Sequence, residues 1–378
     1  MSRATTNKDQ AVSDVISERL DEALGTATEE EDEYLRSLTR DEAMKLGKRA
    51  RLRWFFHVQL IHKELERISM QLSELLDPNN ETRIITLIGP TGNGKTTLAF
   101  RLVDEIVASR SGVALSGEVP VIYVRAPANG QRSMSWAGLY GSILRAGNEP
   151  ALKRTRNVVE EAGHLKLRGI KTLDALRDAL ERMLKHRKVK LLIIDEALHM
   201  LRWANYSAVM DTLKSLGDAG ETKLLLMGDY TLVEAATQYG QVARRSELLH
   251  YTRYQRNDAK HKREFAKRVQ RLETLWPCED APAISKISEE LMEASLGSIG
   301  LLKSLLLKAA FLQMERPDEK WDISVLAKAA KSRKLLQTIE REIVAGEAAI
   351  AGHTYGESLF ESEEVLTKLA QKMVAING

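Results

Sequence analysis

Eight consecutive residues have the types and the spacing of a phosphate-binding loop. They fit the pattern G-x-x-x-x-G-K-[ST] at every fixed position, from Gly89 to Thr96. Glycines let the backbone wrap so that successive N–H groups face an anion, and the helix that follows adds its positive dipole end. In such a loop the lysine reaches the β- and γ-phosphates, and the last hydroxyl binds Mg²⁺. We therefore expect ATP with Mg²⁺, held by Gly89, Pro90, Thr91, Gly92, Asn93, Gly94, Lys95, Thr96 and Thr97.

A second motif supplies the carboxylates that nucleotide hydrolysis needs. The apolar run 191–194 (LLII) predicts a buried strand that ends at Asp195 and Glu196. Ligands bind at the carboxyl ends of strands in open α/β sheets. We expect Asp195 to hold Mg²⁺ together with Thr96, and Glu196 to orient or deprotonate the attacking water. Lys95 and Asp195 are 100 residues apart, which favours an NTPase with an added strand between the motifs.

Two further positions could complete a catalytic site. Asp229 follows the expected strand 223–227 (KLLLM), where a sensor of the γ-phosphate would lie, although an acid beside phosphate is unusual. Arg244 and Arg245 come 15 and 16 residues later. In ring-forming ATPases an arginine at such a place enters the neighbour's site and neutralises charge in the transition state. The alternative is an exposed arginine pair.

The elements that must position these residues predict an α/β P-loop NTPase with a parallel sheet between helices. Expected strands at 83–88, 119–124, 189–194, 223–227 and 248–254 alternate with helical stretches. We expect residues 1–80 to form a helical N-terminal extension, 81–276 the nucleotide-binding domain, 277–334 a small helical lid and 335–378 a C-terminal tail. Residues 126–170 are expected to be an insertion of loops and short helices. The tail could be a hook for a partner or a flexible end.

Composition bounds the class of protein. The chain has 378 residues, 43% of them hydrophobic, and a formal net charge of +3, which is ordinary for a globular protein of two or more domains. Its single cysteine, Cys278, excludes an intramolecular disulfide and suits a reducing, cytoplasmic setting. We expect no membrane partner, because no apolar run approaches the roughly 18 residues of a membrane span.

The distribution of charge indicates nucleic acid. Residues 244–271 hold ten Lys/Arg against three acids. Such clusters suit phosphate backbones, which attract without reading sequence, so we expect binding of duplex DNA without sequence preference. A solvated helix face or a contact between subunits is the alternative for 244–271. The insertion adds the candidate DNA-binding residues Lys153, Arg154, Arg156, Lys166, Arg168 and Lys171.

With these motifs, the chain resembles an AAA+ ATPase, and more narrowly the TnsC/TniB group of transposition regulators, relatives of IstB and MuB. The resemblance covers roughly residues 50–315. The motifs that carry it are Leu52-Arg53-Trp54, Ile88 to Thr96, Leu192 to Ala197, Leu226 to Asp229, Arg244-Arg245 and Gly297 to Leu302. It implies a homo-oligomer on duplex DNA, a ring or a helical filament with six or seven subunits per turn. Such an oligomer would hydrolyse ATP, mark target DNA and recruit or activate a transposase, with target-selector proteins as further partners.

The chain departs from this family pattern at two positions. The strand end that usually carries Thr or Asn has Asp229, and the lid arginine of many AAA+ proteins would fall near Gly300, where the nearest basic residue is Lys303. Slow hydrolysis, modulated by DNA or a partner, would be consistent with both departures.

Two other functions stay open. A replication-type loader or initiator would require a DNA-binding domain after the lid, and residues 335–378 are too few for one. A nucleotide-dependent scaffold ATPase would not bind DNA. Stimulation of ATP hydrolysis by DNA would distinguish the DNA-bound regulator from such a scaffold. We recognise no acidic triad of a nuclease or transposase, so we do not expect the chain to cut DNA.

Overall fold

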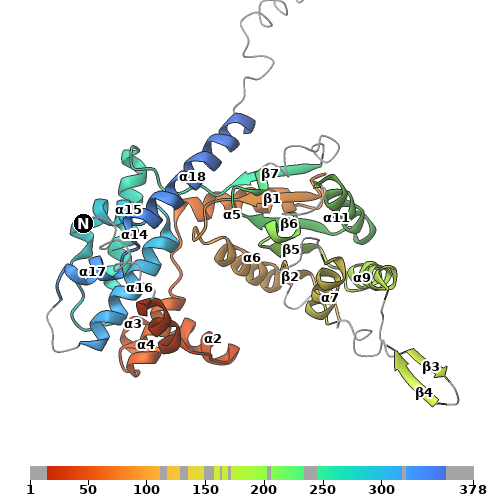
Figure 1. Ribbon diagram of the computed structural model, residues 1–378, viewed down its shortest axis with the longest axis horizontal. Coiled ribbons are helices and arrows are strands. Elements are labelled where there is room, and N and C mark those ends of the chain that lie inside the picture. Colours follow the sequence, from red (N-terminus) through yellow and green to blue (C-terminus); the bar gives the residue numbers. More distant parts are fainter. Residues whose placement is uncertain are drawn as a thin grey trace, which may run out of the picture.

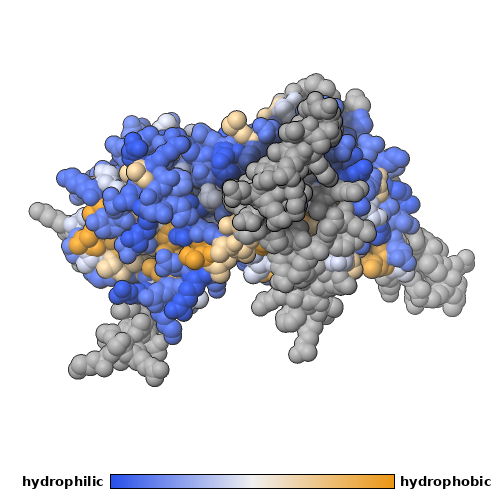
Figure 2. All heavy atoms as spheres, turned by 90° about the horizontal axis from the view of Figure 1, so that it is seen from above, coloured by the Kyte–Doolittle hydropathy of each residue, from blue (hydrophilic) through white to orange (hydrophobic). Residues whose placement is uncertain are grey.

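The computed structural model describes residues 15–110, 117–127, 135–148, 157–161, 164–168, 172–201, 206–233, 245–316 and 321–354. Figure 1 shows two parts, a sheet with helices on both faces and a body made only of helices. None of the described helices has the length and apolarity needed to cross a membrane. In the view of Figure 2, hydrophilic residues cover most of the described surface and hydrophobic residues form small separate patches.

The sheet has five parallel strands in the order β2-β5-β6-β1-β7. The strands are β1 (Ile84–Ile88), β2 (Val121–Arg125), β5 (Leu191–Asp195), β6 (Lys223–Gly228) and β7 (Ser246–His250). The two strands that precede the nucleotide motifs, β1 and β5, are separated by β6. Along the chain, β2 lies between the two motifs, as expected. In the sheet, β6 lies between the two strands that carry the motifs. The expected fold class is confirmed.

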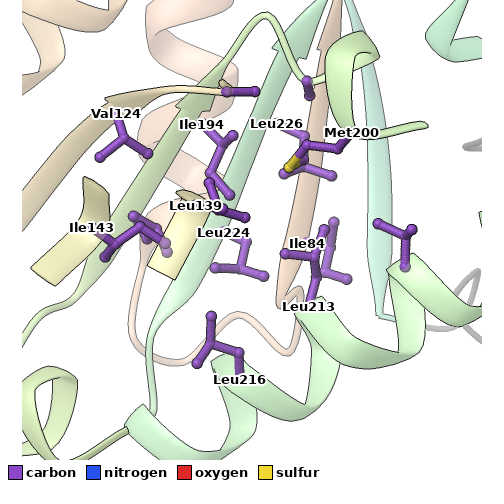
Figure 3. Close-up of a cluster of buried hydrophobic side chains, with 14 of the residues drawn as sticks. Ile84, Val124, Leu139, Ile143, Ile194, Met200, Leu213, Leu216, Leu224 and Leu226 are labelled. Carbon is purple, nitrogen blue, oxygen red and sulfur yellow. The ribbon is translucent and has the colours of Figure 1, made fainter. Parts of the chain in front are cut away.

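Two apolar clusters cover the two faces of the sheet. In β1, Ile84 and Ile88 face one cluster and Ile85 and Leu87 face the other, as the alternation of side chains along a strand requires. The first cluster, drawn in Figure 3, is completed by three helices, α7 (Trp136–Ala146), α9 (Leu173–His186) and α11 (Tyr206–Gly220). The second is completed by α5 (Lys63–Leu76) and α6 (Lys95–Arg110). The three inner strands β1, β5 and β6 are buried on both faces and are mostly apolar runs.

A third apolar cluster joins the helices at the two ends of the described chain. Its largest members include Trp54, Phe55 and Trp276, and the rings of Phe55 and Trp276 meet edge to face with centroids 5.7 Å apart. The N-terminal helices are residues 15–24, α2 (Glu29–Ser37), α3 (Arg40–Ala43) and α4 (Lys48–His57). The lid helices are η1 (Ile284–Ile287), α15 (Ser288–Ala294), α16 (Ile299–Glu315) and α17 (Ser324–Ala329). They pack with α14 (Ala259–Thr274), the last helix of the expected nucleotide-binding domain. The N-terminal extension thus packs on the lid through one core.

The insertion differs from the expected loops and short helices. Its first part is the 11-residue helix α7, whose Leu139, Tyr140, Ile143 and Leu144 are buried. Two glycines inside α7 weaken its helical propensity, and packing against the sheet outweighs that cost. Its second part is an antiparallel hairpin of β3 (Asn157–Glu161) and β4 (His164–Arg168), which forms a separate sheet and projects from the body in Figure 1.

The last described helix returns from the lid to the sheet. This helix, α18 (Arg333–Thr354), has Ile350 in the first apolar cluster and an ion pair of 2.8 Å between Glu347 and Arg253. The expected tail is therefore helical and docked over its first part, to residue 354. The remaining residues, 355–378, lie outside the described part of the chain, as do the first 14.

Candidate nucleotide-binding site

The phosphate-binding loop connects the end of β1 to the start of α6, as expected. Gly92 and Gly94 have φ angles of +78° and +88°, a region that side chains with a Cβ rarely enter. These two residues bend the loop back toward α6, so the N–H groups at the helix start face the space above the sheet. The β6 edge lies beside it, since the Gly89 N–H donates to the Gly228 carbonyl at 3.3 Å.

Lys95 lies folded against its own loop. Its ammonium donates to the carbonyls of Gly89 and Pro90 at 2.7 and 2.9 Å. Burial lowers the pKa of Lys95 to about 8, while the carboxylates of Asp229 and Asp195 act in the opposite direction. A bound phosphate would place a further negative charge beside this ammonium, so the site is suited to an anion.

Three donors fix the carboxylate of Asp195. Its Oδ2 accepts from the Thr96 hydroxyl at 2.8 Å and from the Tyr123 hydroxyl at 2.9 Å, and its Oδ1 accepts from the Glu196 N–H at 2.8 Å. The two residues predicted to bind the metal are thus brought together from α6 and β5. Burial and the negative charge of Asp195 raise the pKa of Tyr123 to about 12, so it remains a donor. Tyr123 was not predicted from sequence, although its alternation with Val124 in β2 placed it on the face toward α6.

The donor set at Thr96 and Asp195 fits a magnesium ion. A hydroxyl and a carboxylate are the hard oxygen ligands that Mg²⁺ takes from proteins, with nucleotide phosphates and waters completing the shell. In the described residues, no group of three or more His, Cys, Asp or Glu side chains could hold a metal ion alone.

Glu196 directly follows β5 at the carboxyl end of the parallel strands, and its carboxylate is about half exposed. Its φ angle of +54° turns the chain sharply after β5. Arg125, at the end of β2, places its Nε 3.9 Å from one carboxylate oxygen, and His199 places its Nε2 3.4 Å from the other. The carboxylate is therefore accessible to a water and lies between two side chains that can carry positive charge.

Asp229 follows β6 and its side chain turns back on its own loop. Its Oδ1 accepts from the N–H of Thr231 at 3.0 Å and from the Thr231 hydroxyl. Its negative charge still acts on Lys95. The structure thus brings it to the edge of the loop, and its role as a sensor stays a prediction.

The two candidate finger arginines have different outcomes. Arg244 lies outside the described residues. Arg245 is exposed directly before β7, and its carbonyl accepts from the N–H of Arg83 at 2.8 Å. This is the opposite end of the sheet from the phosphate loop, and a five-residue parallel strand spans about 16 Å. Arg245 therefore cannot reach the loop of its own chain, and a catalytic role would require a neighbouring copy.

The lid helix α16 begins against the phosphate loop. The Ser298 hydroxyl donates to the Gly92 carbonyl at 3.0 Å, and a Cβ built on Gly300 would lie 1.7 Å from the same oxygen. The lid arginine of many AAA+ proteins would fall near position 300, and this position has no room for a side chain. Lys303 binds the carbonyls of Phe56 and Val58 in the N-terminal extension, and burial lowers its pKa to about 8. Lys303 therefore ties the lid to that extension.

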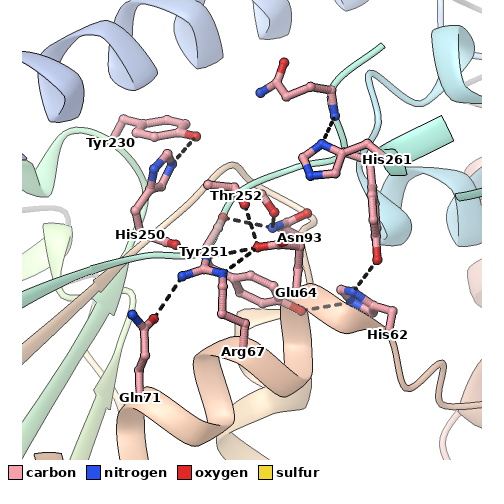
Figure 4. A network of polar contacts seen from close by, with 12 residues as sticks. His62, Glu64, Arg67, Gln71, Asn93, Tyr230, His250, Tyr251, Thr252 and His261 are labelled. Atoms are coloured by element: carbon pink, nitrogen blue, oxygen red, sulfur yellow. Dashed lines mark hydrogen bonds and ion pairs between the residues drawn. The ribbon is translucent and has the colours of Figure 1, made fainter. Parts of the chain in front are cut away.

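A polar network connects the phosphate-binding loop to the segment after β7 and to the start of α5 (Figure 4). The Asn93 amide donates to the carbonyls of Tyr251 and Thr252 at 3.0 and 2.9 Å. The Tyr251 hydroxyl meets His62 at 3.1 Å, and the Thr252 hydroxyl donates to Glu64 at 2.7 Å. The segment after β7 thus connects the loop to the start of α5. Sequence alone carries no signal for this network, because these hydrogen-bonded partners lie up to 189 residues apart.

Two of the six candidate DNA-binding residues lie in the hairpin. Lys166 and Arg168 lie in β4, at positions that pair with 159 and 157 of β3. The other four, Lys153, Arg154, Arg156 and Lys171, lie outside the described residues. DNA contact by all six stays a prediction.

Comparisons with known proteins agree with this architecture. Residues 79–235 match the AAA domain family. A comparison with curated proteins finds no match. The strand order, the phosphate loop and this match together give the P-loop fold of AAA+ type.

Several solved structures are similar in fold. The Aeropyrum pernix ORC2 protein in its ADP form is 18% identical with a TM-score of 0.49, covering 70% of this chain and 66% of its own. The Aeropyrum pernix ORC1 protein in complex with DNA is 16% identical with a TM-score of 0.49, covering 72% and 65%. Domain III of the Thermotoga maritima replication initiation protein DnaA is 12% identical with a TM-score of 0.42, covering 72% and 92%. This chain thus spans about two thirds of each of the two ORC proteins.

Proposed function

We propose that this chain, which carries an AAA domain, is an ATP-hydrolysing protein that assembles into oligomers on duplex DNA. The observation that carries the ATPase is the joined pair Thr96–Asp195 beneath the phosphate loop, with the accessible carboxylate of Glu196 next to it. Lys95 would bind the β- and γ-phosphates, Mg²⁺ would lie at Thr96 and Asp195, and Glu196 would activate water.

The position of Arg245 supports the proposed oligomer. An arginine finger at the far end of the sheet requires a neighbouring subunit's phosphates, so hydrolysis would depend on assembly. Head-to-tail contacts of this kind produce a ring or a filament, depending on whether the rotation closes. The same proposal includes the domain boundaries: a helical N-terminal extension (1–80), a nucleotide-binding domain (81–276), a helical lid (277–334) and a C-terminal tail (335–378).

Two finer roles are compatible with this class. One is a replication-type loader or initiator. The other is a regulator of DNA transposition, which the resemblance of the motifs to the TnsC/TniB group favours. None of the solved structures reported above is a transposition regulator.

The test is negative-stain imaging with duplex DNA in the presence of ATP, a slowly hydrolysed analogue or ADP. We expect rings or filaments on DNA with the triphosphates only, and hydrolysis stimulated by DNA. Lys95→Ala should abolish assembly, and Glu196→Gln should keep assembly while hydrolysis falls at least 100-fold. Oligomers that ignore DNA would instead identify a scaffold ATPase. Recruitment of a replicative helicase or of a transposase to the DNA-bound oligomer would separate the two finer roles.

A further inference from the structure

Six of the ten Lys/Arg residues of the segment 244–271 lie on two surfaces of the structure. On one of them the cations are neutralised. Arg253, Arg256 and Lys262 form ion pairs with acids of α18 and α15 at N···O distances of 2.8–3.1 Å. The hollow beside them adds Glu290 and Glu340, so its three cations face four acids. This surface has no excess of positive charge to offer a polyanion.

The other surface lies along the outer face of α14. The inner face of this helix buries Phe265, Val269 and Leu272 completely. Its outer residues recur at spacings of three and four, and they border a hollow of about 670 Å³. We call this the α14 hollow, lined by Lys63, Lys260, Arg263, Glu264, Ala266, Lys267, Gln270 and Ser285.

The charges of the α14 hollow are unbalanced. It has four cations and one acid, Glu264, which is 5% exposed. Glu264 holds the ammonium groups of Lys63 and Lys267 at 3.0 and 2.9 Å, and these hydrogen bonds lower its pKa to about 2, so it stays ionised. The buried acid therefore fixes two of the cations in place and leaves an excess of three positive charges around the hollow.

We propose that the α14 hollow binds the phosphate backbone of duplex DNA. From Lys260 to Lys267 the cations extend over seven residues of helix, about 10 Å. Duplex DNA carries one negative charge per roughly 1.7 Å of its axis, so a row of this length faces several phosphates. The Gln270 amide and the Ser285 hydroxyl add neutral donors of the kind that bind phosphate oxygens.

This inference rests on the proposed action on DNA and adds a contact surface along α14 to the one predicted in the insertion. None of its lining residues belongs to the nucleotide site, so nucleotide binding can be measured independently. Backbone contacts carry no sequence information, and binding through the hollow should be uniform across sequences.

The experiment compares two double variants of the full chain by fluorescence anisotropy with duplex DNA and a slowly hydrolysed ATP analogue, at several salt concentrations. Lys260→Ala with Arg263→Ala removes two cations from the hollow. We expect at least a tenfold loss of affinity for every sequence, and a salt dependence shallower by about 2 in log–log slope. Arg256→Ala with Lys262→Ala removes the same charge from the balanced surface and should leave the slope unchanged.

Two controls keep the result specific. ADP binding and ATP-driven assembly without DNA should be the same in both variants and the parent. A loss of assembly in the Lys260/Arg263 variant would overturn the proposal in favour of a contact between subunits. So would equal losses in the two variants, which would indicate a general charge effect, or equal loss of polyglutamate or duplex RNA binding, which would indicate a site for any polyanion. If the parent itself binds no duplex, the proposed action on DNA and this site both fail, whereas a parent that binds duplex as well as the Lys260/Arg263 variant does would overturn the site alone.

Discussion

At the scale of single residues, Lys95 combines a binding role with a cost to stability. Its pKa is lowered to about 8 in the folded chain from 10.5, so folding disfavours the charged form. That cost is complete below pH 8 and disappears as pH rises from 8 toward 10.5. We expect Lys95→Met to raise the free energy of unfolding of the nucleotide-free protein by roughly 1–3 kcal/mol at pH 7.

The measurement is denaturant unfolding without nucleotide at pH 7 and pH 9, with ADP binding as a second readout. The gain should shrink at pH 9, and ADP affinity should be lost at both values. A variant less stable than the parent at pH 7 would contradict the assigned burial of the charge.

His62 gives a pH dependence of the same sign at lower pH. Burial between the hydroxyls of Tyr251 and Tyr254 lowers its pKa to about 4 from 6.5, so the unfolded chain binds the proton more readily. Stability from this group is complete above pH 6.5 and is lost as pH falls toward 4, by roughly 2–3 kcal/mol. Thermal unfolding between pH 7 and 4.5 should show that His62→Gln has a shallower loss than the parent. Parallel curves would mean that His62 is not the group concerned.

These two residues show how far sequence could predict the site. Lys95 was identified because a loop with all fixed positions in place carries its own local geometry. The same holds for Thr96, Asp195 and Glu196, each next to a recognisable strand. His62 and Tyr123 were not, because each contributes through a partner far along the chain, and no local pattern marks such a contact.

At the scale of elements, the first turn of α16 packs against the phosphate-binding loop. The contact leaves no room for a Cβ at Gly300, and Ser298 adds a hydrogen bond to the same carbonyl. We expect Gly300→Ala to displace the lid and weaken ADP binding about tenfold or more, since the clash is with backbone. Ser298→Ala removes only the hydrogen bond and should cost severalfold at most. Calorimetric titration of the two variants measures this order, and unchanged affinity in Gly300→Ala would show that the lid contact is not coupled to the nucleotide.

Element boundaries were predicted well for strands whose side chains are buried on both faces of the sheet. They were predicted poorly for elements whose burial depends on contacts far along the chain. The strands of the sheet lie within a few residues of the expected ranges because both faces are covered. The position of α7 within the insertion was not predicted, because its glycines weaken its propensity. The hairpin β3–β4 was not predicted, and it forms a two-stranded sheet apart from the five-stranded one. The common core of the N-terminal extension and lid was also beyond sequence, since Phe55 and Trp276 are more than 200 residues apart.

At the scale of the whole molecule, the sheet separates the phosphate loop from Arg245. One end of β1 holds the loop, and the other lies beside the start of β7. A single chain therefore has a nucleotide site and, at a distance, a group that could complete the site of a neighbour. Stacking copies head to tail would bring the two ends together, and each subunit would then lend its arginine to the next.

This arrangement predicts complementation between two inactive variants. We expect Arg245→Ala to bind ADP normally and to lose ATP hydrolysis by 10³-fold or more in assemblies, the range for an arginine finger. Glu196→Gln should also be inactive, because it lacks the general base. In a mixed assembly, a Glu196→Gln subunit still supplies Arg245 to an Arg245→Ala neighbour, which still has Glu196, so hydrolysis should return. The same mixture made with Arg244→Ala shows which arginine acts. Absence of recovery with either arginine would mean that hydrolysis does not use a neighbour's residue.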